Sequence, residues 1–197
     1  PCGNDGARNF LEQYEEKERI RLLALQEQED PYVRLARYTI EAFVETGKLP
    51  EVPEGLPEEL CSTRAGAFVS LKEDGRLRGC IGTIQAVRSS LAEEIMHNAV
   101  SACSEDPRFA PVEAWEVGRL AISVDVLGET EEISSTEELD AARYGVIVTR
   151  GAKRGLLLPN LEGVDTAEQQ IAIAKQKAGI KAYESVKLER FEVIRHH

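Results

Sequence analysis

The spacing of apolar residues along the chain predicts short helices and strands in an irregular order. From residue 31 to about 45, apolar side chains recur every three or four positions, as on one face of a helix. Asp30 and Pro31 suit the start of this helix, and Gly47 suits its end. Residues 120–127 alternate between apolar and small or polar side chains, which predicts a half-buried strand. Further helices are expected over 10–29, after Ser89 or Ser90, near Trp115, from Ser135 to Ala142, and from Asp165 to Gly179.

Two hairpins and a final strand complete the pattern. Strand-like runs at 67–71 and 77–84 flank Asp74-Gly75, which is a good sequence for a type I′ turn. A second hairpin is expected over 144–158, and a last strand over 186–194. Because strands and helices do not alternate regularly, the chain is expected to be α+β, with a mixed, mostly antiparallel sheet and flanking helices.

The chain is expected to divide into three segments. Residues 1–29 are rich in charged and amide side chains and have a thin apolar stripe, which predicts a polar helical extension or linker. Residues 30–195 are expected to form the folded domain. His196-His197 resemble the start of a purification tag, which leaves His97 as the one native histidine under this interpretation.

Composition narrows the classes of partner. The 24 Lys and Arg residues against 35 Asp and Glu give a net charge of −11, so nucleic acid is not expected as a partner, because phosphate binding needs a basic face. No apolar run reaches the roughly 18 residues of a membrane span, and the first residues do not resemble a signal peptide. A cytoplasmic protein without a membrane partner is expected.

The cysteines do not predict a metal site. Cys2, Cys61, Cys80 and Cys103 form no C-x-x-C pair and have no histidine at zinc-ligand spacing. Reduced thiols, no bound metal and no cofactor are therefore expected.

One segment has unusual chemistry for a strand. In residues 77–83, Cys80 lies between two glycines, which weaken a strand and permit close approach of a neighbour. Arg78 is two residues away and is therefore expected on the same face, where its charge would favour the thiolate. A small buried cysteine is the alternative interpretation.

Four separated motifs resemble the AMMECR1 domain family. They are the run LRGCIGT at 77–83, His97-Asn98-Ala99, Asp106-Pro107-Arg108-Phe109 and Gly155-Leu156-Leu157-Leu158-Pro159, and the resemblance spans roughly residues 30–194. It implies an α+β fold with a larger and a smaller subdomain and a cleft between them. It also implies partnership with a Memo-like protein and a radical SAM enzyme.

Two hypotheses for function follow. In the first, the domain is a binding or accessory module that uses Arg78, Cys80, Asn98 and Arg108 to bind a small anionic ligand or a segment of a Memo-like protein. In the second, it is an enzyme with Cys80 as nucleophile or as ligand to a substrate-bound metal, and His97 as base. The structural alternatives are that Arg108 pairs with Asp106 and that His97 is an ordinary helix residue.

Overall fold

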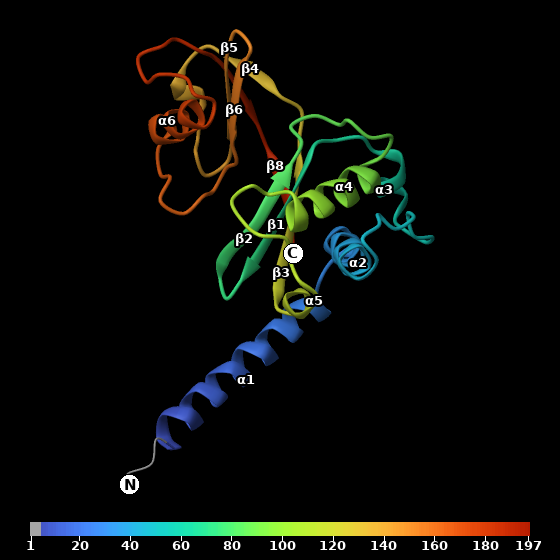
Figure 1. Ribbon diagram of the computed structural model, residues 1–197. Coiled ribbons are helices and arrows are strands. Elements are labelled where there is room, and N and C mark those ends of the chain that lie inside the picture. The colour runs from blue at the N-terminus through green and yellow to red at the C-terminus, as the bar shows by residue number, and fades with distance from the viewer. Residues whose placement is uncertain (1–4) are drawn as a thin grey trace. The chain divides into compact units, whose positions relative to one another are not determined.

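A computed structural model describes residues 5–197 and divides the chain into two compact units (Figure 1). The first unit extends to Val124 and includes His196 and His197, and the second spans Asp125–Arg195. Helices are combined with two four-stranded sheets, so the predicted α+β class is confirmed. Cys2 lies outside the described residues. Across residues 5–197, no helix combines the length and apolar composition needed to cross a bilayer.

The first sheet has the strand order β2-β1-β3-β8. The helix α4 packs against β1 and β2, and α2 packs against α4. The elements of this part of the chain are α1 (Asp5–Glu27), α2 (Pro31–Thr46), α3 (Glu58–Ser62), β1 (Ala67–Glu73), β2 (Arg76–Gly82), α4 (Leu91–Ser104), α5 (Ala114–Val117), β3 (Leu120–Leu127) and, at the end of the chain, β8 (Val193–His196).

The helix α2 has the predicted ends. The side chain of Asp30 accepts hydrogen bonds from the backbone amides of Tyr32 and Val33, at 3.0 and 3.1 Å. Gly47 ends the helix in the left-handed conformation, with φ of 70°. Both signals act locally, within a few residues of the helix end, which is why the sequence alone reveals them.

The first hairpin confirms the predicted turn but contains an irregularity. Asp74 and Gly75 have φ values of 50° and 76°, as a type I′ turn requires. Leu71 pairs with Gly79 and Lys72 pairs with Leu77, so Arg78 is an extra residue in β2. Such a bulge disturbs the strict alternation of side chains. We predicted that Arg78 and Cys80 share a face because their spacing would place them so in a regular strand. The bulge at Arg78 removes the basis of that prediction.

Gly79 lets α4 lie against the sheet. A Cβ atom at Gly79 would overlap the carbonyl oxygen of Ala102 in α4, so a larger residue would push the helix away. Leu71, opposite Gly79, is fully buried. One of the two glycines noted in the sequence therefore permits close approach of a helix backbone.

The second unit contains the sheet β4-β7-β5-β6. Val146, Val148 and Leu157 of this sheet form an apolar core with Ile171 and Ala174 of the helix α6. Gly155 again removes a Cβ atom that would overlap a helix carbonyl oxygen, here that of Ala174. The elements are β4 (Glu131–Ile133), the 3₁₀ helix η1 (Thr136–Glu138), β5 (Gly145–Arg150), β6 (Lys153–Leu157), α6 (Ala167–Lys177) and β7 (Lys187–Phe191).

Three predicted elements differ from the structure. Ser135 and Glu138 form the expected capping box, but the helix ends after one turn because Leu139 is extended. The cap of α6 is Thr166 with Gln169, one residue later than expected. The predicted final strand is divided: β7 belongs to the second sheet and β8 to the first.

The two ends of the chain remain matters of prediction. In α1, Tyr14 and Leu25 are 57% and 52% exposed, and Gln26 donates a hydrogen bond to the carbonyl of Gly118. The imidazole of His196 stacks on Tyr32 with ring centroids 3.7 Å apart and is hydrogen-bonded to Asp30. The linker at 1–29 and the tag at His196-His197 stay predictions.

Candidate functional site

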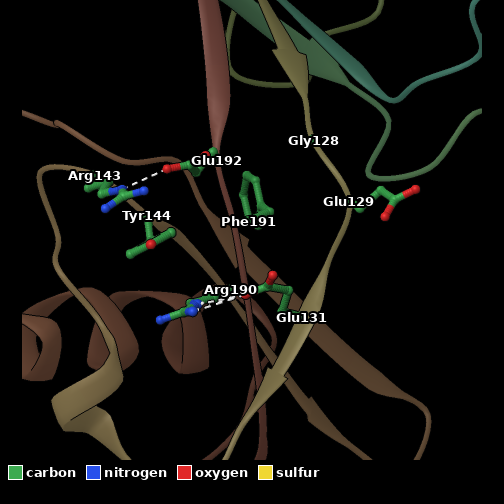
Figure 2. Close-up of a pocket in the computed structure, with 8 residues that line it drawn as sticks. All are labelled: Gly128, Glu129, Glu131, Arg143, Tyr144, Arg190, Phe191 and Glu192. Carbon is green, nitrogen blue, oxygen red and sulfur yellow. Dashed lines mark hydrogen bonds and ion pairs between the residues drawn. The ribbon is translucent and has the colours of Figure 1, made fainter.

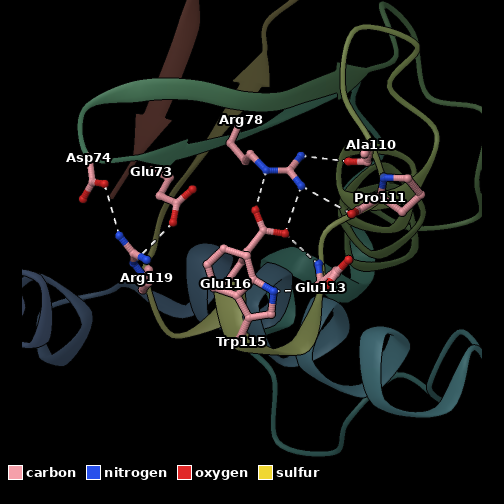
Figure 3. Close-up of polar contacts among 9 residues, drawn as sticks. All are labelled: Glu73, Asp74, Arg78, Ala110, Pro111, Glu113, Trp115, Glu116 and Arg119. Atoms are coloured by element: carbon pink, nitrogen blue, oxygen red, sulfur yellow. Dashed lines mark hydrogen bonds and ion pairs between the residues drawn. The ribbon is translucent and has the colours of Figure 1, made fainter.

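Arg78 is held by a partner 38 residues further along the chain. Its Nε and Nη2 atoms donate to the two carboxylate oxygens of Glu116 at 2.7 and 3.0 Å (Figure 3). Its other donors bind the carbonyls of Ala110 and Pro111. The two charged side chains are only 15% and 8% exposed, and the Arg78 hydrogen bond lowers the pKa of Glu116. Arg78 therefore ties β2 to α5 and the preceding loop.

The backbone of Cys80 is held by two side chains of the Asp106-Pro107-Arg108-Phe109 motif. The Cys80 amide donates to Asp106 Oδ2 at 2.9 Å, and Arg108 Nη2 donates to the Cys80 carbonyl at 3.2 Å. Asp106 and Arg108 also pair with each other at 2.7 Å, and this contact holds the pKa of Asp106 far below its usual range. We call this arrangement of Cys80, Asp106 and Arg108 the backbone clasp. Hydrogen bonds thus join two of the four sequence motifs, the run at 77–83 and the Asp106-Pro107-Arg108-Phe109 loop.

The thiol of Cys80 lies on the side of the sheet opposite α4. Leu71 and Gly79 face α4, so their neighbours Ser70 and Cys80 face the other way. The Ser70 hydroxyl donates to Cys80 Sγ at 3.1 Å, and the thiol is partly exposed. The pKa of Arg108 is raised, first by Asp106 and to a smaller extent by the nearby Cys80 sulfur. Arg108 is therefore a cation close enough to interact with this thiol.

His97 does not lie beside Cys80. It lines a cavity of about 370 Å³ between α4 and the segment that follows β2. Burial and the neighbouring Arg88 lower the pKa of His97, which favours the neutral imidazole. Because α4 covers the sheet face that Cys80 does not occupy, the structure does not bring His97 to the thiol. The cavity is lined by residues that include Thr83, Arg88, Glu94, His97, Ser101 and Glu105.

Asn98 lines the same cavity as His97, but its side-chain amide is bonded to groups of the interior. Its amide donates to the carbonyl of Ala67 at 2.9 Å and to the hydroxyl of Thr83 at 3.1 Å, and the residue is 5% exposed. These bonds tie α4 to the start of β1 and the end of β2. The candidate ligand-binding residue is thus engaged in holding the sheet to its helix.

Glu94 and Glu116 are among the buried carboxylates that sequence reasoning missed. Glu94, 1% exposed, accepts from the Thr83 hydroxyl and from the amides of Val87 and Arg88, at 2.6 to 2.9 Å. Glu116 is the partner of Arg78. Glu94 carries a signal in the sequence, because it falls on the same helix face as the buried Leu91. A charge on an apolar face indicates a paired group.

The described part of the chain contains no group of side chains arranged to bind a metal ion. Among residues 5–197, no three His, Cys, Asp or Glu side chains are grouped so that they could hold an ion.

Two known proteins are similar to this chain over most of its length. The chain is 50% identical over 170 residues to a protein of Thermotoga maritima, an alignment that covers 85% of this chain and 98% of that protein. It is 47% identical over 192 residues to Protein CA_C1420 of Clostridium acetobutylicum, with coverage of 95% and 41%. The chain therefore spans about two fifths of the length of the clostridial relative.

A solved structure shares the fold. The crystal structure of protein PH0010 from Pyrococcus horikoshii matches with a TM-score of 0.78 and 33% sequence identity, over 83% of this chain and 88% of that one. The family model named AMMECR1 matches residues 33–196, which include the backbone clasp, Asn98 and both sheets. The chain belongs to the AMMECR1 family.

Proposed function

We propose that the chain is a cytoplasmic binding module that acts with a Memo-like protein and a radical SAM enzyme. The site is the backbone clasp together with the Cys80 thiol and Ser70, all in the first unit. Its ligand is a carboxylate, either of a small molecule or of a peptide segment of the Memo-like partner.

The exposed guanidinium of Arg108 carries this proposal. Its side chain is 54% exposed, although Asp106 beside it is 2% exposed. Asp106 holds the Nε and Nη2 atoms, which fixes the orientation of the guanidinium plane. A cation with a fixed plane and an accessible edge suits a carboxylate, because less side-chain entropy is lost on binding.

Arg78 and Asn98 have positioning roles in this proposal. Arg78 fixes the loop that precedes α5 by binding the carbonyls of Ala110 and Pro111, and this loop follows directly after Arg108. Asn98 fixes α4 on β1. Both residues act by keeping the clasp in place.

A binding measurement with a purified Memo-like protein tests the proposal. Arg108→Gln should weaken the complex at least tenfold, because it removes the charge and the outward Nη1 donors. Arg34→Gln is the matched control, since Arg34 is an exposed arginine of α2. Equal affinity for the two variants, or no complex with the unaltered protein, contradicts the proposal.

An enzyme that uses Cys80 as nucleophile is the second candidate. The observation in its favour is the Ser70 hydroxyl, which donates to Cys80 Sγ at 3.1 Å, beside the guanidinium of Arg108, which binds the Cys80 carbonyl. His97, the predicted base, would need a water chain or a substrate group to act on the thiol, because it lies on the side of α4.

Alkylation of the intact protein separates the two candidates. Cys61 is exposed and serves as the reference for fast alkylation. Burial raises the pKa of Cys103 to about 11, so Cys103 is the reference for slow alkylation. If Cys80 reacts faster than Cys61, and Arg108→Gln removes the difference, the enzyme is favoured. If Cys80 reacts more slowly than Cys61 and is protected by the Memo-like partner, the binding module is favoured.

A further inference from the structure

The second unit has a cavity of about 290 Å³ that the functional proposal does not use. Figure 2 shows Tyr144 between two arginine side chains on one side of this cavity. The guanidinium carbons of Arg143 and Arg190 lie 4.9 and 4.4 Å from the centre of its ring. The cavity thus has a wall of two cations that share one aromatic ring.

Arg190 is the fixed member of this pair. It donates to Glu131 at 3.0 Å and to the carbonyl of Glu138 at 2.7 Å, and its side chain is 24% exposed. These bonds use both edges of the guanidinium. Its charge therefore remains behind the Tyr144 ring, where it adds to the field in the cavity.

Arg143 is the exchangeable member. Among the described residues, its hydrogen bonding is limited to Nε, which contacts Glu192 at 2.6 Å, so the Nη1 and Nη2 atoms have no protein acceptor. The side chains of Arg143 and Glu192 are 63% and 55% exposed. Ion pairs this exposed contribute little net stability, because water screens the attraction and ordering two long side chains costs entropy. An incoming anion can therefore replace Glu192 as the partner of Arg143 with little loss of folding stability.

Three carboxylates and two guanidinium groups line the cavity, so attraction for an anion is confined to the arginine wall. Glu131 is occupied by Arg190, and Figure 2 shows the Glu129 carboxylate turned away from the arginine wall. If Glu192 moves aside, Arg143 is the cation in the cavity without a partner. Its guanidinium then presents a flat pair of donors.

We propose that this cavity binds a small oxyanion, the carboxylate or phosphate group of a small molecule. Arg143 Nη1 and Nη2 donate to two of its oxygens, Arg190 supplies long-range attraction from behind Tyr144, and Glu192 acts as a displaceable internal competitor. The two guanidinium groups cover the Tyr144 ring, so the ligand is recognised by its charge and not by stacking on that ring.

A titration of the full chain with inorganic phosphate, and separately with acetate, tests this site. Nuclear magnetic resonance signals of the backbone amides of Arg143, Tyr144 and Glu192 should shift together on addition of at least one anion. Arg143→Gln should weaken binding at least tenfold, and Arg143→Lys about threefold, because lysine keeps the charge but loses the donor pair. Glu192→Gln should tighten binding about threefold, because it removes the competing carboxylate.

The control is Arg154→Gln, which removes another arginine of the second unit that pairs with a glutamate, Glu189. This variant should bind both anions unchanged. If Arg143→Gln binds as well as Arg154→Gln, or if Glu192→Gln weakens binding, the proposal is wrong. Preference for phosphate over acetate assigns a phosphate ligand, the reverse assigns a carboxylate, and no shift with either anion overturns the site.

Discussion

The two units use arginine–glutamate pairs differently. In the first unit, the side chains of Arg78 and Glu116 are nearly buried, and their remaining hydrogen-bonding atoms bind backbone groups. In the second unit, Arg143 and Glu192 are exposed and bind each other through a single donor. Burial turns the first pair into a structural link, whereas exposure leaves the second pair free to exchange. The same two residue types therefore differ in role because of their surroundings.

Removing one member from each pair should give the largest difference. Glu116→Ala should lower the free energy of unfolding by about 3 kcal/mol or more, because it leaves the Arg78 charge buried without a partner. Glu192→Ala should cost about 0–1 kcal/mol, because its arginine is solvated. Urea unfolding of both variants measures the two values. Similar costs would mean that exposure does not distinguish the pairs.

Replacing the glycine that lies under a helix should destabilise both units by a similar amount. Gly79→Ala and Gly155→Ala should each cost about 2 kcal/mol, because each new Cβ atom would overlap a helix carbonyl oxygen. Gly118→Ala is the control, since no atom lies within 4 Å of its Cβ position and its φ is −66°. Thermal unfolding of the three variants compares them. A strong effect in one unit alone would show that only one helix packs tightly.

Acid should weaken the first unit through its buried carboxylates. The pKa of Asp106 is depressed by Arg108, and that of Glu116 by Arg78. Their stabilisation is therefore complete above the unfolded values of about 4, and is lost as the pH falls through the lower folded values. Asp106→Asn should cost about 2 kcal/mol at pH 7 and less at pH 3. Unfolding midpoints at both pH values test this, and an equal cost would exclude a charge effect.

The hairpin turn should show a smaller effect than the two glycines under helices. Gly75 has φ of 76° and no atom within 4 Å of its Cβ position, so only backbone strain opposes a side chain there. Gly75→Val should cost about 1 kcal/mol or somewhat more. Chemical unfolding of this variant beside Gly118→Ala separates strain from the loss of glycine itself. If the two variants are equally stable, the type I′ geometry is not required.

Local signals explain which parts of the fold could be predicted. The Asp30 cap, the Asp74-Gly75 turn and the strand at 120–127 depend on residues close in sequence, and all three are confirmed. The predicted alternation in that strand holds only to Val124, because Asp125 and Leu127 are buried. The division into two sheets depends on which distant strands pair, and periodicity carries no information on partners. The break between β7 and β8 at Glu192 was missed for this reason.

The candidate site shows the same limit. Sequence motifs identified Cys80 and Arg108, and the structure joins them through Asp106. The partner of Arg78 could not be predicted, because Glu116 lies 38 residues away and a bulge redirects the strand. Motif residues indicate where contacts converge, but the contacts themselves require the fold.

The backbone clasp has a consequence for how the chain avoids other chains. β2 is an edge strand of its sheet, and such strands expose amides and carbonyls that can pair with a foreign strand. At Cys80 these outward groups are already occupied by Asp106 and Arg108, and Arg78 holds the following loop through the carbonyls of Ala110 and Pro111. A short loop with two charged side chains thus takes the place of a neighbouring strand. The Asp106-Pro107-Arg108-Phe109 loop therefore protects this part of the sheet edge from pairing with a foreign strand.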